Sequence, residues 1–336
     1  MNRHSPIFYI MLITSLIFGG GNQKNTAKAQ DLIGNETTRM NMAINKIDLV
    51  RKITDELNKE IGVPTIFIYP NKQKETSLTS SKFGGIPYWD SSLPYPTDEK
   101  GNKLKLLAQL NLSEISEACK GEVGLLPKDG ILQFFLLSGN DFLYGSDLND
   151  YTNNNCFRVI YHSIINQNIT VEDIQNLCIP ISSSKLADDY EPITGEIGLD
   201  FKMQITSSPL YGEFKELFIK KAALYGWQID DKPDEVFNDI FDCVGDEASD
   251  ELYEYAYHED NCLLGFPVFT QSDPRIDNER YIKYDIQLFQ MVSYDAEEGT
   301  DFIAAWGDAG IAHFFINHNK LIEKNFSDIM YYWDCT

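Results

Sequence analysis

The spacing of apolar residues changes near the start of the chain, from a helical spacing to a continuous run. Between Ile44 and Ile61, apolar residues recur every three or four positions, with lysine and glutamate between them. This spacing predicts an amphipathic helix, which Gly62 and Pro64 then end. The largely apolar run over residues 65–69 comes next and predicts a strand.

Further apolar runs, bounded by glycine, proline and polar turns, predict a series of strands. They cover residues 104–110, 130–137, 157–162, 284–291, 300–306, 310–316 and 329–335. Helical spacing predicts helices over residues 214–225 and 233–241, and a shorter helical turn from Ser113 to Cys119.

The sequence contains an internal repeat. Seven residues return at a constant offset of 180 positions, and Gln109 meets Gln290 one position later. The seven are Gly85, Pro87, Pro94, Gly130, Ile131, Phe134 and Phe135, which match Gly265, Pro267, Pro274, Gly310, Ile311, Phe314 and Phe315. These residue types fix backbone shape and sheet packing, so the repeated unit is a fold unit rather than a catalytic motif.

We therefore predict an α+β fold of duplicated antiparallel-sheet modules, related by a pseudo-twofold axis and flanked by helices. The first repeat covers about residues 81–137 and the second about residues 261–317. Residues 166–260, which have no counterpart in the repeat, are predicted to form a helical insert. The whole domain is expected to run from residue 41 to residue 336.

The N-terminus has the pattern of a signal peptide. Arg3 and His4 precede an apolar run from Ile7 to Phe18, and Ala27-Lys28-Ala29 has the small-residue pattern of a cleavage site. We predict a signal peptide over residues 1–29, a linker over residues 30–40, and export to the periplasm or the medium. The alternative is a permanent membrane helix, but the run is shorter than the roughly 20 residues that a span needs.

The charge balance narrows the range of partners. The chain has 28 lysine and arginine residues against 51 aspartate and glutamate residues, a net charge of −23. Nucleic acid binding needs clustered basic residues, and no basic run occurs. An acidic surface attracts a basic protein or cations, while the alternative interpretation is that the charge keeps an exported protein soluble.

Six cysteines leave two alternatives open, buried free thiols or disulfides, with fifteen connectivities for three bridges. No C-x-x-C pair occurs, which argues against a structural zinc site, and no metal or cofactor is predicted. No nucleophile, metalloprotease or nucleotide-binding motif occurs in the mature chain, so no catalytic residue is assigned.

Candidate ligand-binding residues come from turns and from aromatic residues, such as Trp89 and Trp306, that are expected to line a groove where the two modules meet. Arg275 either forms a bidentate ion pair with a carboxylate of a ligand or pairs with a neighbouring acidic residue. Asp273, Asp308 and Asp334 are carboxylates that either cap turns or form a pair facing a cleft. The complete candidate set is Trp89, Tyr144, Asp147, Asp273, Arg275, Trp306, Asp308 and Asp334.

Several segments together resemble the YwqG-like family, a domain of unknown function. They include Ser81–Tyr88, Leu106–Gln109, Gly130–Phe135, Phe157–Tyr161, Phe269–Arg275, Trp306–Gly310 and Tyr332–Cys335. The resemblance extends from about residue 45 to the end and implies an α+β fold with a duplication, but no reaction, substrate or cofactor. This chain departs from the family at Leu264-Gly265, where relatives usually have two glycines, and at Val292, where relatives often have an acid.

Two functions fit these observations. The first is a non-enzymatic binding protein that holds a small ligand or a basic protein partner, as an inhibitor or immunity-type factor would. The second is a hydrolase or carbohydrate-active enzyme that uses paired carboxylates near Asp273, Asp308 or Asp334.

Overall fold

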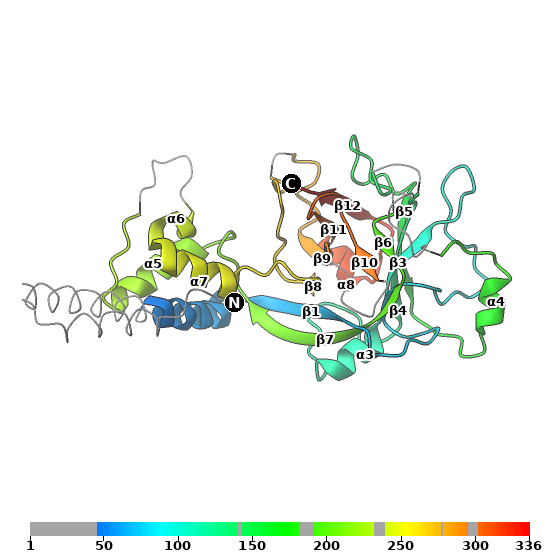
Figure 1. The fold of residues 1–336 in the computed structure, drawn as a ribbon, viewed down its shortest axis with the longest axis horizontal. Coiled ribbons are helices and arrows are strands. Elements are labelled where there is room, and N and C mark those ends of the chain that lie inside the picture. The colour runs from blue at the N-terminus through cyan, green and yellow to red at the C-terminus, as the bar shows by residue number, and fades with distance from the viewer. Residues whose placement is uncertain (1–45, 140–142, 182–190, 232–238, 277, 295–301) are drawn as a thin grey trace, which may run out of the picture. The chain divides into compact units, whose positions relative to one another are not determined.

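The structure is a computed structural model that describes residues 46–139, 143–181, 191–231, 239–276, 278–294 and 302–336. The predicted signal peptide, the linker, and the start of the helix predicted over residues 233–241 lie outside the described residues. The fold is mixed α/β and is dominated by one large antiparallel sheet (Figure 1).

The chain divides into two compact units. The larger contains Glu56–Phe214 and Ala256–Thr336, and the smaller contains Lys215–Tyr255 with the described residues of Met1–Asp55. The helix that opens the described chain covers residues 46–61, close to the predicted range. All strands of the large sheet lie in the larger unit.

The large sheet has ten strands in the order β12-β11-β9-β8-β1-β7-β2-β3-β4-β5. Their bounds are β1 Val63–Asn71, β2 Lys82–Gly84, β3 Lys105–Asn111, β4 Ile131–Leu136, β5 Phe157–His162, β7 Glu196–Thr206, β8 Cys262–Leu264, β9 Ile286–Val292, β11 Ile311–Ile316 and β12 Ile329–Asp334. A separate two-stranded sheet joins β6 (Ile193–Thr194) to β10 (Ile303–Ala304).

The centre of the sheet is the antiparallel pair β1 and β7, which run side by side in Figure 1. Their register extends from Val63 opposite Thr206 to Asn71 opposite Gly198. The prediction of a helical insert over residues 166–260 missed β7, the longest strand of the sheet. The strand pattern is present in the sequence, because apolar Leu199, Phe201 and Met203 alternate with polar residues, but the prediction extended the helical spacing of neighbouring segments over it.

Each side of the central pair carries four strands in the same order along the chain, β2-β3-β4-β5 on one side and β8-β9-β11-β12 on the other. We call these the first arm and the second arm. Both arms contain a register shift at the same place: the β3–β4 pairing skips Leu107, and the β9–β11 pairing skips Leu288. The two predicted sheet modules are thus parts of one sheet, which β1 and β7 join.

The core lies between the two arms. The ring centroid of Phe134 in the first arm is 4.8 Å from that of Phe289 and 4.9 Å from that of Phe314, both in the second arm. Phe157 of β5 and Tyr331 of β12 are also in ring contact, at 5.3 Å. Because β5 and β12 stand at opposite ends of the strand order, the sheet curls until it is nearly closed.

Short helices connect the strands of the larger unit. They are α3 Leu112–Ala118, α4 Val171–Gln175 and α8 His318–Ile322. The sequence predicts a helix start near Ser113, but the N-cap is Asn111, whose side chain accepts hydrogen bonds from the backbone N–H groups of Ser113 and Glu114.

The smaller unit is helical. Its elements include α6 Ile240–Val244, most of α5 Phe214–Leu224 and nearly all of α7 Asp246–Ala256. Arg51 forms an ion pair with Glu251, and the Tyr255 hydroxyl donates to Asp55, so both contacts join the opening helix to α7. Among the described residues, no helix has the length and apolar composition needed to cross a membrane.

Candidate functional site

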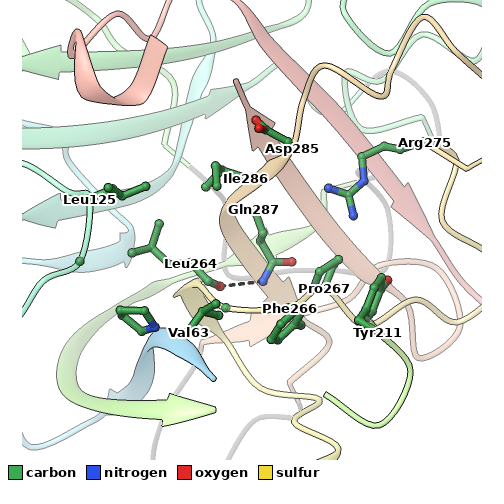
Figure 2. Close-up of a pocket in the computed structure, with 13 residues that line it drawn as sticks. Val63, Leu125, Tyr211, Leu264, Phe266, Pro267, Arg275, Asp285, Ile286 and Gln287 are labelled. Carbon is green, nitrogen blue, oxygen red and sulfur yellow. Dashed lines mark hydrogen bonds between the residues drawn. The ribbon is translucent and has the colours of Figure 1, made fainter. Parts of the chain in front are cut away.

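A pocket of about 450 Å³ opens in the larger unit (Figure 2). Apolar side chains make up much of its lining: Val63, Leu125, Leu264, Phe266, Pro267 and Ile286. The polar side chains on its walls are Tyr211, Arg275, Asp285 and Gln287. This volume and this mixture of many apolar and few polar groups are typical of sites that bind small ligands or single side chains.

Strand ends and loops bring these residues together. Val63 begins β1, Leu264 ends β8, and Gln287 is the second residue of β9. Because Thr65 stands opposite Leu264 in the β1–β8 register, the start of β1 and the end of β8 share one wall. Leu125 comes from the loop after α3.

Arg275 is held rigidly in the pocket wall. Its Nε and Nη2 atoms donate to the two carboxylate oxygens of Asp273 at 2.9 and 2.6 Å, and Nη1 donates to the carbonyl oxygen of Tyr284 at 3.1 Å. The guanidinium carbon lies 4.1 Å from the ring centroid of Phe315. The side chains of Arg275 and Asp273 are only 13% and 6% exposed, so the pair is fixed and largely shielded from water.

Gln287 links the pocket wall to a buried histidine. Its Nε2 donates to the carbonyl oxygen of Leu264 at 3.0 Å and to Sγ of Cys262 at 3.4 Å. Its Oε1 therefore faces Nδ1 of His313, at 3.4 Å, as an acceptor. Among the described residues, Nε2 of His313 has no hydrogen-bond partner.

His313 is packed as a neutral ring. It is fully buried, and its centroid is 4.4 Å from that of Phe269. Burial lowers the pKa of His313 well below its usual value, and the positive charge of Arg275 lowers the pKa further. The imidazole therefore carries no charge at neutral pH.

The first arm has a different composition at the same positions of the repeat. Tyr95 stands where the second arm has Arg275, and Leu106 stands where it has Gln287. The ring of Tyr95 packs 5.8 Å from Phe135, just as Arg275 packs on Phe315. The first arm thus has an apolar cluster here, whereas the second arm has polar side chains beside a pocket.

The predicted aromatic site residues are part of the core. Trp89 is 2% exposed, packs in the apolar cluster of the first arm, and donates from Nε1 to the carbonyl oxygen of Leu93 at 3.1 Å. Tyr144 and Trp306 are also buried, with ring centroids 5.8 Å apart. None of these three side chains lines the pocket.

Asp147 lines a second, smaller cavity of about 290 Å³. One carboxylate oxygen accepts the backbone N–H of Asn149 at 2.9 Å, and the other accepts from Nδ2 of Asn153 at 2.8 Å. This arrangement is an Asx turn that organises the loop. No group of three histidine, cysteine, aspartate or glutamate residues in the described parts of the chain is placed to hold a metal ion.

The three candidate carboxylates, Asp273, Asp308 and Asp334, lie in different surroundings. Asp273 pairs with Arg275, while Asp334 accepts the backbone N–H groups of Thr270 and Gln271 at 3.3 and 2.9 Å. Burial raises the pKa of Asp334. Asp308 is exposed. None of the three lines the pocket or the second cavity.

Of the predicted site residues, only Arg275 lines the pocket, with Asp273 held against it. Sequence reasoning missed Tyr211, Leu264, Phe266 and Gln287. One signal pointed here, because Leu264 replaces the first glycine of the pair that relatives usually have and takes a left-handed φ of 59°.

No curated protein matches the chain. The family described as Domain of unknown function (DUF1963) matches residues 81–335, which include both arms and most of the pocket. With most of its length matched and the resembling segments in both arms, the chain belongs to the DUF1963 family, which is the YwqG-like family.

Proposed function

We propose that this protein is a non-enzymatic binding protein, and that the pocket beside Arg275 holds part of its partner. The observation that carries the proposal is a 450 Å³ pocket with apolar walls and a few oriented polar groups. The apolar packing at the same positions of the first arm adds support, because polar residues at the pocket are then a feature of the second arm alone.

The contacts of the candidate carboxylates favour binding over hydrolysis. Retaining and inverting glycosidases need two carboxyl groups that face one cleft, roughly 5–10 Å apart. Asp273 and Asp334 use their oxygens on Arg275 and on backbone amides instead, and Asp308 lies at the surface. A binding role needs none of them at a cleft.

The partner that fits the charge of the chain is a basic protein. The net charge of −23 produces a negative field that attracts a cationic protein and speeds its approach. Asp285 is exposed at the pocket and places a carboxylate where a basic side chain of such a partner would lie. An inhibitor or immunity-type factor has these properties.

The proposal extends to the origin of the fold. The matched strand order, the matched register shifts and the constant sequence offset support two arms that arose by duplication and are related by a pseudo-twofold axis between β1 and β7. A duplication gives two equivalent places in the fold, so one arm is free to become a binding site while the other keeps its packing.

Export is the remaining element of the proposal, and it rests on the signal-peptide pattern of residues 1–29. Expression of the full chain in a bacterial host, followed by fractionation and intact mass measurement, tests it. The expected product is a periplasmic or secreted chain that begins near residue 30. A full-length product in the cytosol would refute export.

The binding proposal is tested by capture of the partner with the full chain and two matched variants. Leu125 lines the pocket and is 39% exposed, whereas Leu148 is 64% exposed and lines neither cavity. We expect Leu125→Arg to abolish capture of a basic protein and Leu148→Arg to leave capture unchanged. Equal capture by both variants would show that the pocket is not the binding site.

A further inference from the structure

Arg275 has hydrogen-bonding capacity that the described residues do not use. A guanidinium group has five N–H groups, one on Nε and two on each terminal nitrogen. Nε and one N–H of Nη2 donate to Asp273, and one N–H of Nη1 donates to Tyr284. Nη1 and Nη2 therefore keep one N–H each, on a side chain that lines the pocket (Figure 2).

The pocket offers these two donors without a net positive charge. Asp273 compensates the charge of Arg275 through a pair of hydrogen bonds in a largely buried place. His313 is neutral, and burial together with the charge of Asp273 raises the pKa of Tyr211, so its hydroxyl stays protonated. Asp285 is the remaining charged side chain of the pocket lining, and it is negative.

This charge balance selects against an anion. A carboxylate placed on Nη1 and Nη2 would meet Asp273 and Asp285 across a partly desolvated space, where like charges repel more strongly than in water. A carbonyl oxygen accepts the same two N–H groups and brings no charge. The apolar wall formed by Leu125, Leu264 and Phe266 suits a hydrophobic group attached to that carbonyl.

We propose that the pocket binds an uncharged, apolar segment of polypeptide, with a backbone carbonyl on the two remaining N–H groups of Arg275. The segment is internal to its chain, because a C-terminal residue would bring a carboxylate. The inference rests on the proposed binding function and adds to it the chemistry that the pocket recognises. Apolar contact anchors the partner, and the acidic surface attracts its basic side chains.

Two small probes test this directly on the full chain at pH 7. N-acetyl-leucinamide has an apolar side chain and only neutral carbonyl groups, while N-acetyl-leucine replaces one amide by a carboxylate. We expect ligand-observed NMR titration to show that the amide binds roughly tenfold more tightly than the acid. Equal affinities, or tighter binding of the acid, would overturn the inference.

Charge variants give a second and independent test. Asp273→Asn removes the compensating charge beside Arg275, and we expect the preference to shift toward the acid by roughly tenfold or more. Asp285→Asn leaves the Arg275 pair intact and should shift the preference in the same direction by a smaller factor. Asp308→Asn removes the same charge from an exposed position outside the pocket and should leave the preference unchanged.

The outcomes separate this inference from the binding proposal. A preference that responds to Asp308→Asn as much as to Asp285→Asn would reflect overall charge and would overturn the inference. If neither probe binds while Leu125→Arg still abolishes partner capture, the recognition chemistry is wrong but the pocket remains the binding site. If Leu125→Arg has no effect on capture, the binding proposal itself fails.

Discussion

The carboxylate of Glu196 in β7 occupies the place that a Cβ atom on Gly85 would need. The same carboxylate accepts the backbone N–H of Ile86 at 3.2 Å, so it holds the chain where β2 ends. In the second arm, the side chain of Thr65 in β1 occupies the corresponding place over Gly265. Each glycine lets a side chain of the central strand pair cross directly above the backbone of its arm.

Alanine at position 85 is therefore expected to destabilise the fold strongly. Gly85 has a φ of 72°, which costs a residue with a Cβ about 1 kcal/mol, and the clash with Glu196 adds to this cost. We expect Gly85→Ala to lower the free energy of unfolding by about 3 kcal/mol or more in urea denaturation. Gly101→Ala is the matched control, because its φ is 82° and nothing lies within 4 Å of the new Cβ. Equal losses in both variants would show that Glu196 moves aside without cost.

At Leu264, we expect a glycine variant to be more stable than an alanine variant, which is the reverse of the usual order. Its φ of 59° favours glycine over any residue with a Cβ, whereas its side chain is 6% exposed and contributes apolar burial. Leu264→Ala loses the burial and keeps the strain, but Leu264→Gly loses the burial and relieves the strain. We expect the glycine variant to be the more stable of the two by about 1 kcal/mol. An alanine variant that melts at the higher temperature would contradict the strain at this position.

Asp334 and Asp308 separate a structural carboxylate from an exposed one. Replacement of Asp334 by asparagine leaves one of its two partly buried backbone N–H partners facing an amide nitrogen instead of an acceptor oxygen. We expect Asp334→Asn to lower the free energy of unfolding by about 1–3 kcal/mol and Asp308→Asn to change it by less than about 0.5 kcal/mol. Chemical denaturation followed by tryptophan fluorescence measures both. A stable Asp334→Asn protein would show that this carboxylate does not hold the 270–271 turn.

His162 gives the stability a pH dependence. Burial lowers its pKa in the folded state from 6.5 to about 4, and its Nε2 lies 2.8 Å from Oε1 of Gln133. The unfolded state takes up a proton below pH 6.5 and the folded state does not, so this stability is present above pH 6.5 and is lost as the pH falls toward 4. The loss is about 1.4 kcal/mol per pH unit and about 3 kcal/mol in total.

The variant His162→Gln removes this titration and keeps an N–H donor for Gln133. We expect urea midpoints measured from pH 7.5 to pH 4.5 to fall less steeply in the variant than in the parent protein. The difference between the two proteins isolates His162, because His313, Asp260 and Asp334 titrate equally in both. Parallel pH profiles would show that folding does not lower the pKa of His162.

Much of the sheet is predictable from the sequence because its strands are short and apolar. The prediction over residues 157–162 coincides with β5, and the predictions for β4, β9, β11 and β12 agree to within about two residues at each end. β7 was missed although apolar residues stand at every second position from Ile197 to Ile205, which is the pattern of a half-buried strand. This segment has no counterpart in the sequence repeat, and the helical spacing of residues 214–225 was extended over the whole insert.

The site was harder to predict because a pocket depends on packing that is distant in sequence. Gln287 belongs to a buried strand, and nothing in its neighbours distinguishes an amide in a pocket wall from an amide in the core. Trp89 and Trp306 were expected to line a groove because large aromatic residues often do, but both are core residues. Arg275 was predicted as a site residue because it is a basic residue close to an acid, whereas Leu264 was noted only as a departure from a glycine pair.

The strand order also determines when the protein can fold during synthesis. β1 is made first, but its two neighbours, β7 and β8, end at residues 206 and 264. The first arm is complete at residue 162 and consists of local hairpin pairings, which form fast. A nascent chain therefore holds an assembled first arm and an unpaired β1 until β7 is made about forty residues later, and one edge of β1 then stays open until β8 is made. An edge left open for that time is a place where chaperones bind.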